Sequence, residues 1–171
     1  MDTPDNKTRS RVVTWEDPFE VAKISAEMDG LSFLKLMIEN KKNPPIASSL
    51  SFRLTEATEG KAVFTFEPAE YHYNPLGVVH GGVAATVLDA AMACAIHSLL
   101  PKGKFCTTLE IKVNYLRAIT LKSGLLRCEG EVIHLGKQTS VTQGKVLDNA
   151  GKLYATATAT FMILKTEITE K

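Results

Sequence analysis

An 18-residue run from Val83 to Leu100 constrains the fold of this chain more than any other feature of its sequence. Fourteen of its residues are apolar, and many of them are alanines. The four polar residues are Thr86, Asp89, His97 and Ser98. A helix on the surface of a protein keeps one polar face, so a helix that is apolar on nearly every side must be covered nearly everywhere. We therefore predict a central, buried helix within 83–100.

Alternating apolar and polar residues mark most of the remaining chain as β-structure. Two alternating runs, 51–55 and 61–66, are separated by Glu59-Gly60 and predict a hairpin before the central helix. Four more runs follow the helix, at about 105–116, 124–135, 139–147 and 152–164. Turn-forming residues separate these four runs, so we predict an antiparallel meander. Together these elements predict an α+β domain whose single sheet curls around its helix.

The N-terminal part of the chain carries fewer signals. We predict a polar tail over residues 1–28 and a single domain over 29–171. Leu31, Leu34 and Ile38 recur at helical spacing, which predicts a short amphipathic helix near 31–41. The length of 171 residues and the hydrophobic fraction of 44% are enough for one domain-sized core.

Composition excludes several classes of protein. Twenty Lys and Arg residues against nineteen Asp and Glu residues leave a formal charge of +1, too small to favour nucleic-acid binding. We find no signal-peptide core and no apolar run of membrane-spanning length, so no membrane role is predicted. Cys94, Cys106 and Cys128 form no C-x-x-C pair, which argues against a disulfide framework or a cysteine zinc site. A reducing, cytoplasmic setting is expected.

A loop leads into the central helix through His80-Gly81-Gly82. The first backbone N–H groups of a helix lack intrahelical acceptors, and the helix dipole makes that end positive. Glycine has no Cβ and allows a substrate to approach closely. The two glycines are thus candidate donors to the oxyanion of an acyl-transfer intermediate. The alternative is structural, with glycines needed for packing and with His80 and Asn74 holding the loop together.

Asp89 is the carboxylate of the apolar run. Because burial of a carboxylate is costly, we interpret it either as a general base or as a hydrogen-bonded structural residue. It follows Gly82 by seven residues, about 10 Å along one helix axis, which is too far for both to reach the same carbonyl. If both serve one reaction, the sequence predicts a site shared across a dimer. Apolar residues on the sheet edges and on its outer face also favour association through the sheet.

Taken together, these residues resemble a known family. Asn74, His80-Gly81-Gly82, Asp89 and the strand that contains Thr107-Thr108 are similar to the hotdog-fold thioesterases of the phenylacetate-degradation (PaaI-type) group. The similarity covers about residues 30–165. It implies a hotdog fold with a curved antiparallel sheet of about six strands around one long helix, plus a short N-terminal helix. It also implies hydrolysis of acyl-coenzyme A thioesters in a homodimer or a dimer of dimers, with no cofactor and no metal.

The same resemblance implies roles for individual residues. The Gly81 N–H would polarise the thioester carbonyl, with Gly82 as a second donor. His80 and Asn74 would orient the loop and the thioester. Asp89 would activate a water molecule or attack the carbonyl carbon directly.

Thr108 matches the position of a Ser or Thr that holds the water in related enzymes, with Thr107 as the alternative. Strand alternation places Thr108 on the face of Glu110 and Lys112, opposite Thr107, and on that basis we prefer Thr108. The predicted other face holds Thr107, Leu109, Ile111 and Val113.

For the coenzyme A phosphates, Arg117 and Lys137 are candidates, with solvated surface charges as the alternative. Two other functions stay open, a hotdog hydratase or dehydratase and a non-catalytic acyl-CoA binding or sensing module. A hydratase would need an Asp before Asn74-Pro75 and an earlier histidine than His80, and a sensor would need no base. The identity of the acyl group is not predicted.

Overall fold

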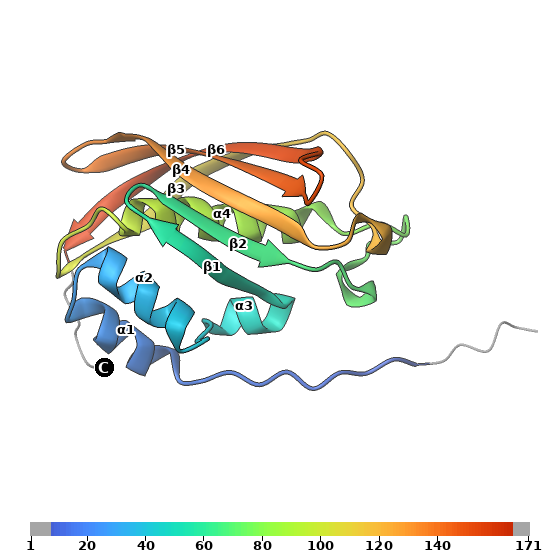
Figure 1. Cartoon of the computed structure of the whole chain (residues 1–171), viewed down its shortest axis with the longest axis horizontal. Coiled ribbons are helices and arrows are strands. Elements are labelled where there is room, and N and C mark those ends of the chain that lie inside the picture. The colour runs from blue at the N-terminus through green and yellow to red at the C-terminus, as the bar shows by residue number, and fades with distance from the viewer. Residues whose placement is uncertain (1–7, 166–171) are drawn as a thin grey trace, which may run out of the picture.

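The computed structural model describes residues 8–165 and confirms the α+β hotdog fold, with one curved sheet over a long central helix (Figure 1). Its α-helices are α1 (Pro18–Ala26), α2 (Gly30–Glu39), α3 (Pro45–Leu50) and α4 (Gly81–His97). Its strands are β1 (Phe52–Thr58), β2 (Lys61–Phe66), β3 (Lys104–Tyr115), β4 (Leu126–Leu135), β5 (Thr139–Asp148) and β6 (Leu153–Lys165). Two short 3-10 helices, η1 (Glu70–His72) and η2 (Leu121–Ser123), lie in the connections.

The central helix packs directly on the sheet because glycine leaves room for its backbone. A Cβ on Gly130 of β4 would lie 2.3 Å from the carbonyl oxygen of Ala91 in α4. Val87, Leu88 and Met92 of α4 are fully buried between sheet and helix. The prediction of a buried central helix is confirmed, and the helix begins at the glycine pair.

The position of β3 differs from the predicted meander. β4, β5 and β6 form a meander, but β3 pairs with β6 and not with β4, in the strand order β1-β2-β4-β5-β6-β3. β4 is occupied on both sides, by β2 and by β5, so it offers no edge to β3. The predicted β1–β2 hairpin is confirmed. As a result, β3 is an edge strand with one side unpaired.

A β-bulge in β3 makes the predicted alternation wrong. The register shifts between Thr108 and Glu110, so Leu109 is an extra residue and every side chain beyond it changes face. Thr108 is opposite the buried Phe161, whereas Thr107 is opposite the more exposed Met162. Thr108 therefore shares the helix-facing side with Ile111 and Val113, which are partly buried against the core.

The chain before residue 29 contains a helix that we did not predict. The side chain of Asp17 caps α1 by accepting a hydrogen bond from the Phe19 N–H at 2.9 Å, and Pro18 starts the helix. The sequence pattern missed α1 because this helix buries no residue and shows no apolar stripe. It also missed α3, which follows Pro44. The predicted helix near 31–41 is confirmed as α2, whereas the boundary at residue 28 stays a prediction, and residues 1–7 lie outside the described residues.

The centre of the outer sheet face carries charged side chains that pair with one another. Lys61 contacts Glu131 at 2.8 Å, and Lys145 contacts Glu129 at 3.1 Å. Exposed apolar side chains lie elsewhere on this face, where Val141 of β5 is 38% exposed, and along the β3 edge, where Leu109 is 52% exposed. The unpaired edge of β3 is thus the part of the sheet best suited to association.

Candidate functional site

The N-terminus of α4 presents one free backbone donor. The His80 side chain caps the helix, and its Nδ1 accepts a hydrogen bond from the Gly82 N–H at 2.9 Å. The Val83 N–H donates to the His80 carbonyl at 3.0 Å. Within residues 8–165, the Gly81 N–H has no acceptor. The first turn therefore offers the Gly81 N–H to a ligand, while the predicted second donor, Gly82, is already engaged by His80.

Tyr115, at the end of β3, fixes this turn from the side. Its hydroxyl donates to the Gly81 carbonyl at 3.0 Å, and a Cβ on Gly81 would lie 3.0 Å from the tyrosine ring. The absent side chain at Gly81 therefore has a packing reason as well as a chemical one. We did not predict this contact, because 34 residues separate the partners and no local pattern joins them.

The loop before α4 is held by its own polar groups. The Asn74 side-chain oxygen accepts hydrogen bonds from Leu76 N–H at 2.9 Å and Val78 N–H at 3.4 Å. The His80 N–H donates to the carbonyl of His72 at 2.8 Å. Asn74 thus acts as a loop-holding residue in the chain, which was the structural alternative considered for it.

Asp89 and Thr108 meet between α4 and β3. The Thr108 hydroxyl donates to Asp89 Oδ1 at 2.8 Å, and both residues are partly exposed. Asp89 lies on the side of α4 that also carries Ala90 and Cys94, all partly exposed in the single chain. Our expectation of a fully interior carboxylate is therefore wrong for one chain. Thr108 orients one carboxylate oxygen, and Thr107 points away from it.

The two halves of the candidate site lie apart within one chain. Gly81 and Asp89 are both on α4, eight residues or about 12 Å of helix apart. Gly81 contacts Tyr115 near the C-terminal end of β3, whereas Asp89 contacts Thr108 near its middle. The structure thus brings Asp89 to Thr108 and His80 to Gly82, but does not bring these two groups together.

The two residues predicted to contact the coenzyme A phosphates, Arg117 and Lys137, lie near opposite ends of β6. Arg117 Nη1 donates to the carbonyl of Leu153, at the start of β6. Lys137 lies in the β4–β5 turn, where the Ile163 N–H near the end of β6 donates to the Gln138 carbonyl at 2.8 Å. Ten residues of strand separate these points on β6, about 33 Å. One chain cannot place both cations on the same phosphate group.

The other reactive side chains have structural surroundings. Burial raises the pKa of Cys94, Cys106 and Cys128 to about 12, so their thiols stay protonated at neutral pH. His72 is 2% exposed and bridges the backbone of η1 and α3, and burial lowers its pKa. Residues 8–165 contain no group of three side chains suited to a metal ion.

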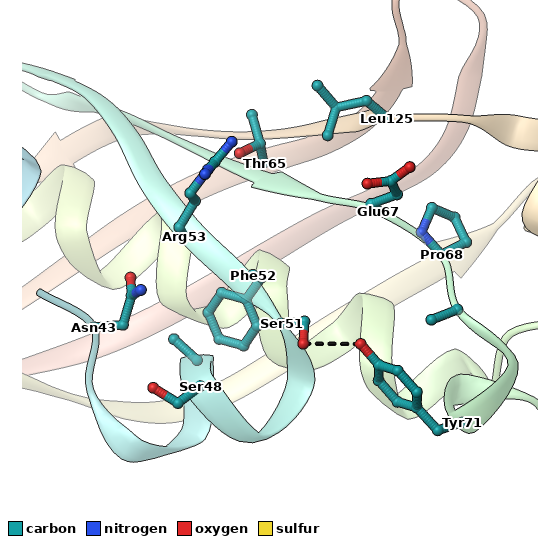
Figure 2. A pocket seen from close by; sticks show the side chains of 12 residues that line it. Asn43, Ser48, Ser51, Phe52, Arg53, Thr65, Glu67, Pro68, Tyr71 and Leu125 are labelled. Carbon is teal, nitrogen blue, oxygen red and sulfur yellow. Dashed lines mark hydrogen bonds between the residues drawn. The ribbon is translucent and has the colours of Figure 1, made fainter. Parts of the chain in front are cut away.

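A separate cavity of about 500 Å³ lies beside α3, β1 and the end of β2 (Figure 2). Arg53, Glu67 and Tyr71 are among its lining residues, and the Tyr71 hydroxyl donates to Ser51 Oγ at 2.8 Å. None of the predicted site residues lines it. This cavity is therefore not the candidate site, which is open to solvent in a single chain.

Comparison with known proteins identifies the family. The family model of the thioesterase superfamily matches residues 76–155, from the loop before α4 to the start of β6. A predicted esterase of Archaeoglobus fulgidus is 30% identical over 119 residues, which are 70% of this chain and 75% of that protein. The chain belongs to the thioesterase superfamily.

Two further proteins that are similar to this chain support its assignment to the thioesterase superfamily. The 1,4-dihydroxy-2-naphthoyl-CoA hydrolase of Listeria monocytogenes is 28% identical over 120 residues, or 70% of this chain and 96% of the hydrolase. The structure of the E. coli PaaI protein, from the phenylacetic acid degradation operon, aligns with a TM-score of 0.69 at 25% identity. That alignment covers 81% of this chain and 99% of PaaI. The resemblance to hotdog thioesterases is confirmed, and the chain is a thioester hydrolase.

The helices described for this thioesterase-superfamily chain do not reach across a lipid bilayer. Across residues 8–165, no helix combines the length and the hydropathy needed to span one.

Proposed function

We propose that this protein hydrolyses acyl-coenzyme A thioesters at a site assembled from two copies of the chain. The observation that carries the proposal is the separation of two reactive features on α4, the free Gly81 N–H and the Asp89 carboxylate held by Thr108. Each feature is half of an acyl-transfer site, with a donor for the oxyanion and a group to activate or replace water.

Dimerisation through β3 joins the two halves. The unpaired edge of β3 can pair with the same edge of a second copy in an antiparallel register. Thr108 and Tyr115 mark the levels of Asp89 and Gly81 along this strand. A two-fold axis near Ile111 places Thr108 of each copy beside Tyr115 of the other copy. Asp89 of one copy then lies close to Gly81 of the other. The Listeria relative is named as an acyl-CoA hydrolase, which supports coenzyme A as the thiol of the substrate.

In this site the Gly81 N–H of one subunit binds the thioester oxygen as it gains charge. Asp89 of the other subunit either takes a proton from water or attacks the carbonyl carbon itself. In the first route the water oxygen bonds to the carbonyl carbon, the C–S bond breaks, and the proton held by Asp89 passes to the coenzyme A thiolate. In the second route a carboxylate oxygen of Asp89 bonds to the carbonyl carbon as the C–S bond breaks, and water then hydrolyses the resulting mixed anhydride to free the carboxylic acid and Asp89. Thr108 keeps the carboxylate in position. His80 shapes the helix start, and Asn74 shapes the loop in front of it.

The test is thiol release from a panel of phenylacetyl-, hydroxybenzoyl- and medium-chain acyl-CoA esters. We expect turnover by the natural protein and a loss of at least about a hundredfold in kcat for Asp89→Asn, which retains the size of the side chain. Asp17→Asn, at the cap of the exposed α1, is the matched control and should leave turnover unchanged. Equal turnover by Asp89→Asn and the natural protein would refute the role of Asp89.

A further inference from the structure

We propose that a hollow at one end of the sheet binds the nucleotide end of coenzyme A, an inference that rests on the proposed function. The hollow has a volume of about 380 Å³ and lies between the chain after α4, the start of β3 and the β4–β5 turn. Its lining residues are Leu99, Leu100, Pro101, Lys104, Leu135, Gly136, Lys137 and Ile163. Most are apolar, as suits an adenine ring, and the polar side chains among them are two lysines.

The side chains that line this hollow include positive charges but no carboxylates. Lys104 and Lys137 line it, and Lys165 of β6 is directly opposite Lys104 of β3. No Asp or Glu lines the hollow, and none of the three lysines forms an ion pair with another residue of the described range 8–165. Like charges at opposed positions of paired strands are destabilising. An anion between them would remove that cost.

The cavity on the outer sheet face provides a contrast. It measures about 370 Å³ and also contains two lysines, Lys61 and Lys145. Their ammonium groups are neutralised by Glu131 at 2.8 Å and Glu129 at 3.1 Å. A phosphate would have to displace these carboxylates there, whereas the lysines of the hollow are available to it.

The length of the coenzyme A arm matches the distance to the hollow. Lys104 precedes Thr108, the hydrogen-bond partner of Asp89, by four residues of strand, about 13 Å. About 13 bonds separate the thioester sulfur from the first phosphorus of coenzyme A, equivalent to slightly more than four peptide residues or about 15 Å. A thioester carbonyl beside Asp89 therefore places the phosphates near Lys104.

The turn that carries Lys137 is anchored on both sides. The Gly136 N–H donates to the Thr139 carbonyl at 2.8 Å within the turn. The Ile163 N–H donates to the Gln138 carbonyl at 2.8 Å and ties the turn to β6. Binding therefore orders only the lysine side chain and not the backbone, which lowers the entropic cost of binding.

Two measurements test this assignment. The first compares a CoA thioester with the same acyl group on N-acetylcysteamine, which lacks the nucleotide. In the double variant Lys104→Gln, Lys137→Gln, we expect the ratio of KM for the CoA thioester to KM for the truncated thioester to rise about tenfold. The second is calorimetric titration with free coenzyme A, in which the Kd should rise about tenfold and the salt dependence of binding should weaken.

The matched control is Lys61→Gln, Lys145→Gln, which removes the same charge from the outer face and should change neither the KM ratio nor the Kd. An unchanged KM ratio and Kd in the Lys104, Lys137 variant would overturn the nucleotide site, as would a natural protein that does not bind free coenzyme A. Binding of coenzyme A through these lysines without hydrolysis of either thioester would instead refute the proposed function alone.

Discussion

At Gly81, a backbone N–H group and a missing side chain serve two different purposes. The N–H is free for an oxyanion, and the bare Cα accommodates the ring of Tyr115. Proline at the first position of a helix removes the N–H without breaking the helix, and the extended ψ of 131° at His80 suits a residue before proline. Gly81→Pro and Gly81→Ala therefore separate the two purposes.

We predict that Gly81→Pro lowers kcat by a hundredfold to a thousandfold relative to Gly81→Ala, about 2.7–4 kcal/mol of transition-state stabilisation. Both variants introduce a Cβ next to Tyr115, so only the loss of the N–H and the proline ring distinguish them. Steady-state hydrolysis of one acyl-CoA ester measures the difference. Equal rates for the two variants would remove Gly81 from the oxyanion site.

The two neighbouring threonines provide a second comparison at this scale. Thr108→Val removes the hydrogen bond to Asp89, and we expect kcat to fall about tenfold, the value of one orienting hydrogen bond. Thr107→Val makes the same change on the other face of β3 and should leave kcat unchanged. Since both positions are in one strand, thermal melting of the two variants controls for stability. A larger loss of kcat for Thr107→Val than for Thr108→Val would contradict the role of Thr108 as the residue that orients Asp89.

At the scale of elements, the contact between α4 and β4 depends on Gly130. A Cβ there would lie 2.3 Å from the Ala91 carbonyl oxygen, and a helix backbone cannot yield as a flexible side chain does. We predict that Gly130→Ala lowers the free energy of unfolding by about 3 kcal/mol. Gly144→Ala should cost less, because its new Cβ meets the Leu88 side chain at 3.1 Å. Urea denaturation ranks the two, and the reverse order would contradict this packing.

At the scale of the whole molecule, a shared site predicts that two inactive variants can restore activity in a mixture. In a mixed dimer of Asp89→Asn and Gly81→Pro chains, one site carries both substitutions and the other carries neither. Random pairing of equal amounts should recover about a quarter of the natural activity per chain. The measurement is hydrolysis after the two variants are unfolded and refolded together. Absence of recovery in mixed dimers would place the whole site within one chain.

The stability of the molecule should fall below neutral pH. Burial lowers the pKa of His72 and of His97 from the ordinary value of 6.5, so the unfolded chain binds protons at a pH where the folded chain does not. The free energy of unfolding therefore decreases as the pH falls below about 6.5, until the folded pKa values are reached. Melting temperatures between pH 7.5 and 5 measure this trend. His72→Asn should make it shallower, and an unchanged slope would exclude His72 as its source.

Local patterns in the sequence were enough for most elements and for the residue types of the site. The apolar run after Gly82 predicted a covered helix, because a helix without a polar face has no other stable surroundings. Alternation predicted six strands, because a side-chain period of two depends only on neighbouring residues. The separation of Gly82 from Asp89 followed from helix rise alone. These features all depend on positions close together in the chain.

Tertiary structure decided what depends on distant partners. The place of β3 at the sheet edge followed from β4 having both sides occupied, which no pattern within β3 could reveal. The bulge at Leu109 arises from pairing with β6, and it gave Thr108 a helix-facing position for a different reason from the one we derived. Tyr115 reached Gly81, and Arg117 and Lys137 were separated, only once the chain had folded. Sequence periodicity determines the elements here, whereas competition for strand edges and pairing register determine which side chains meet.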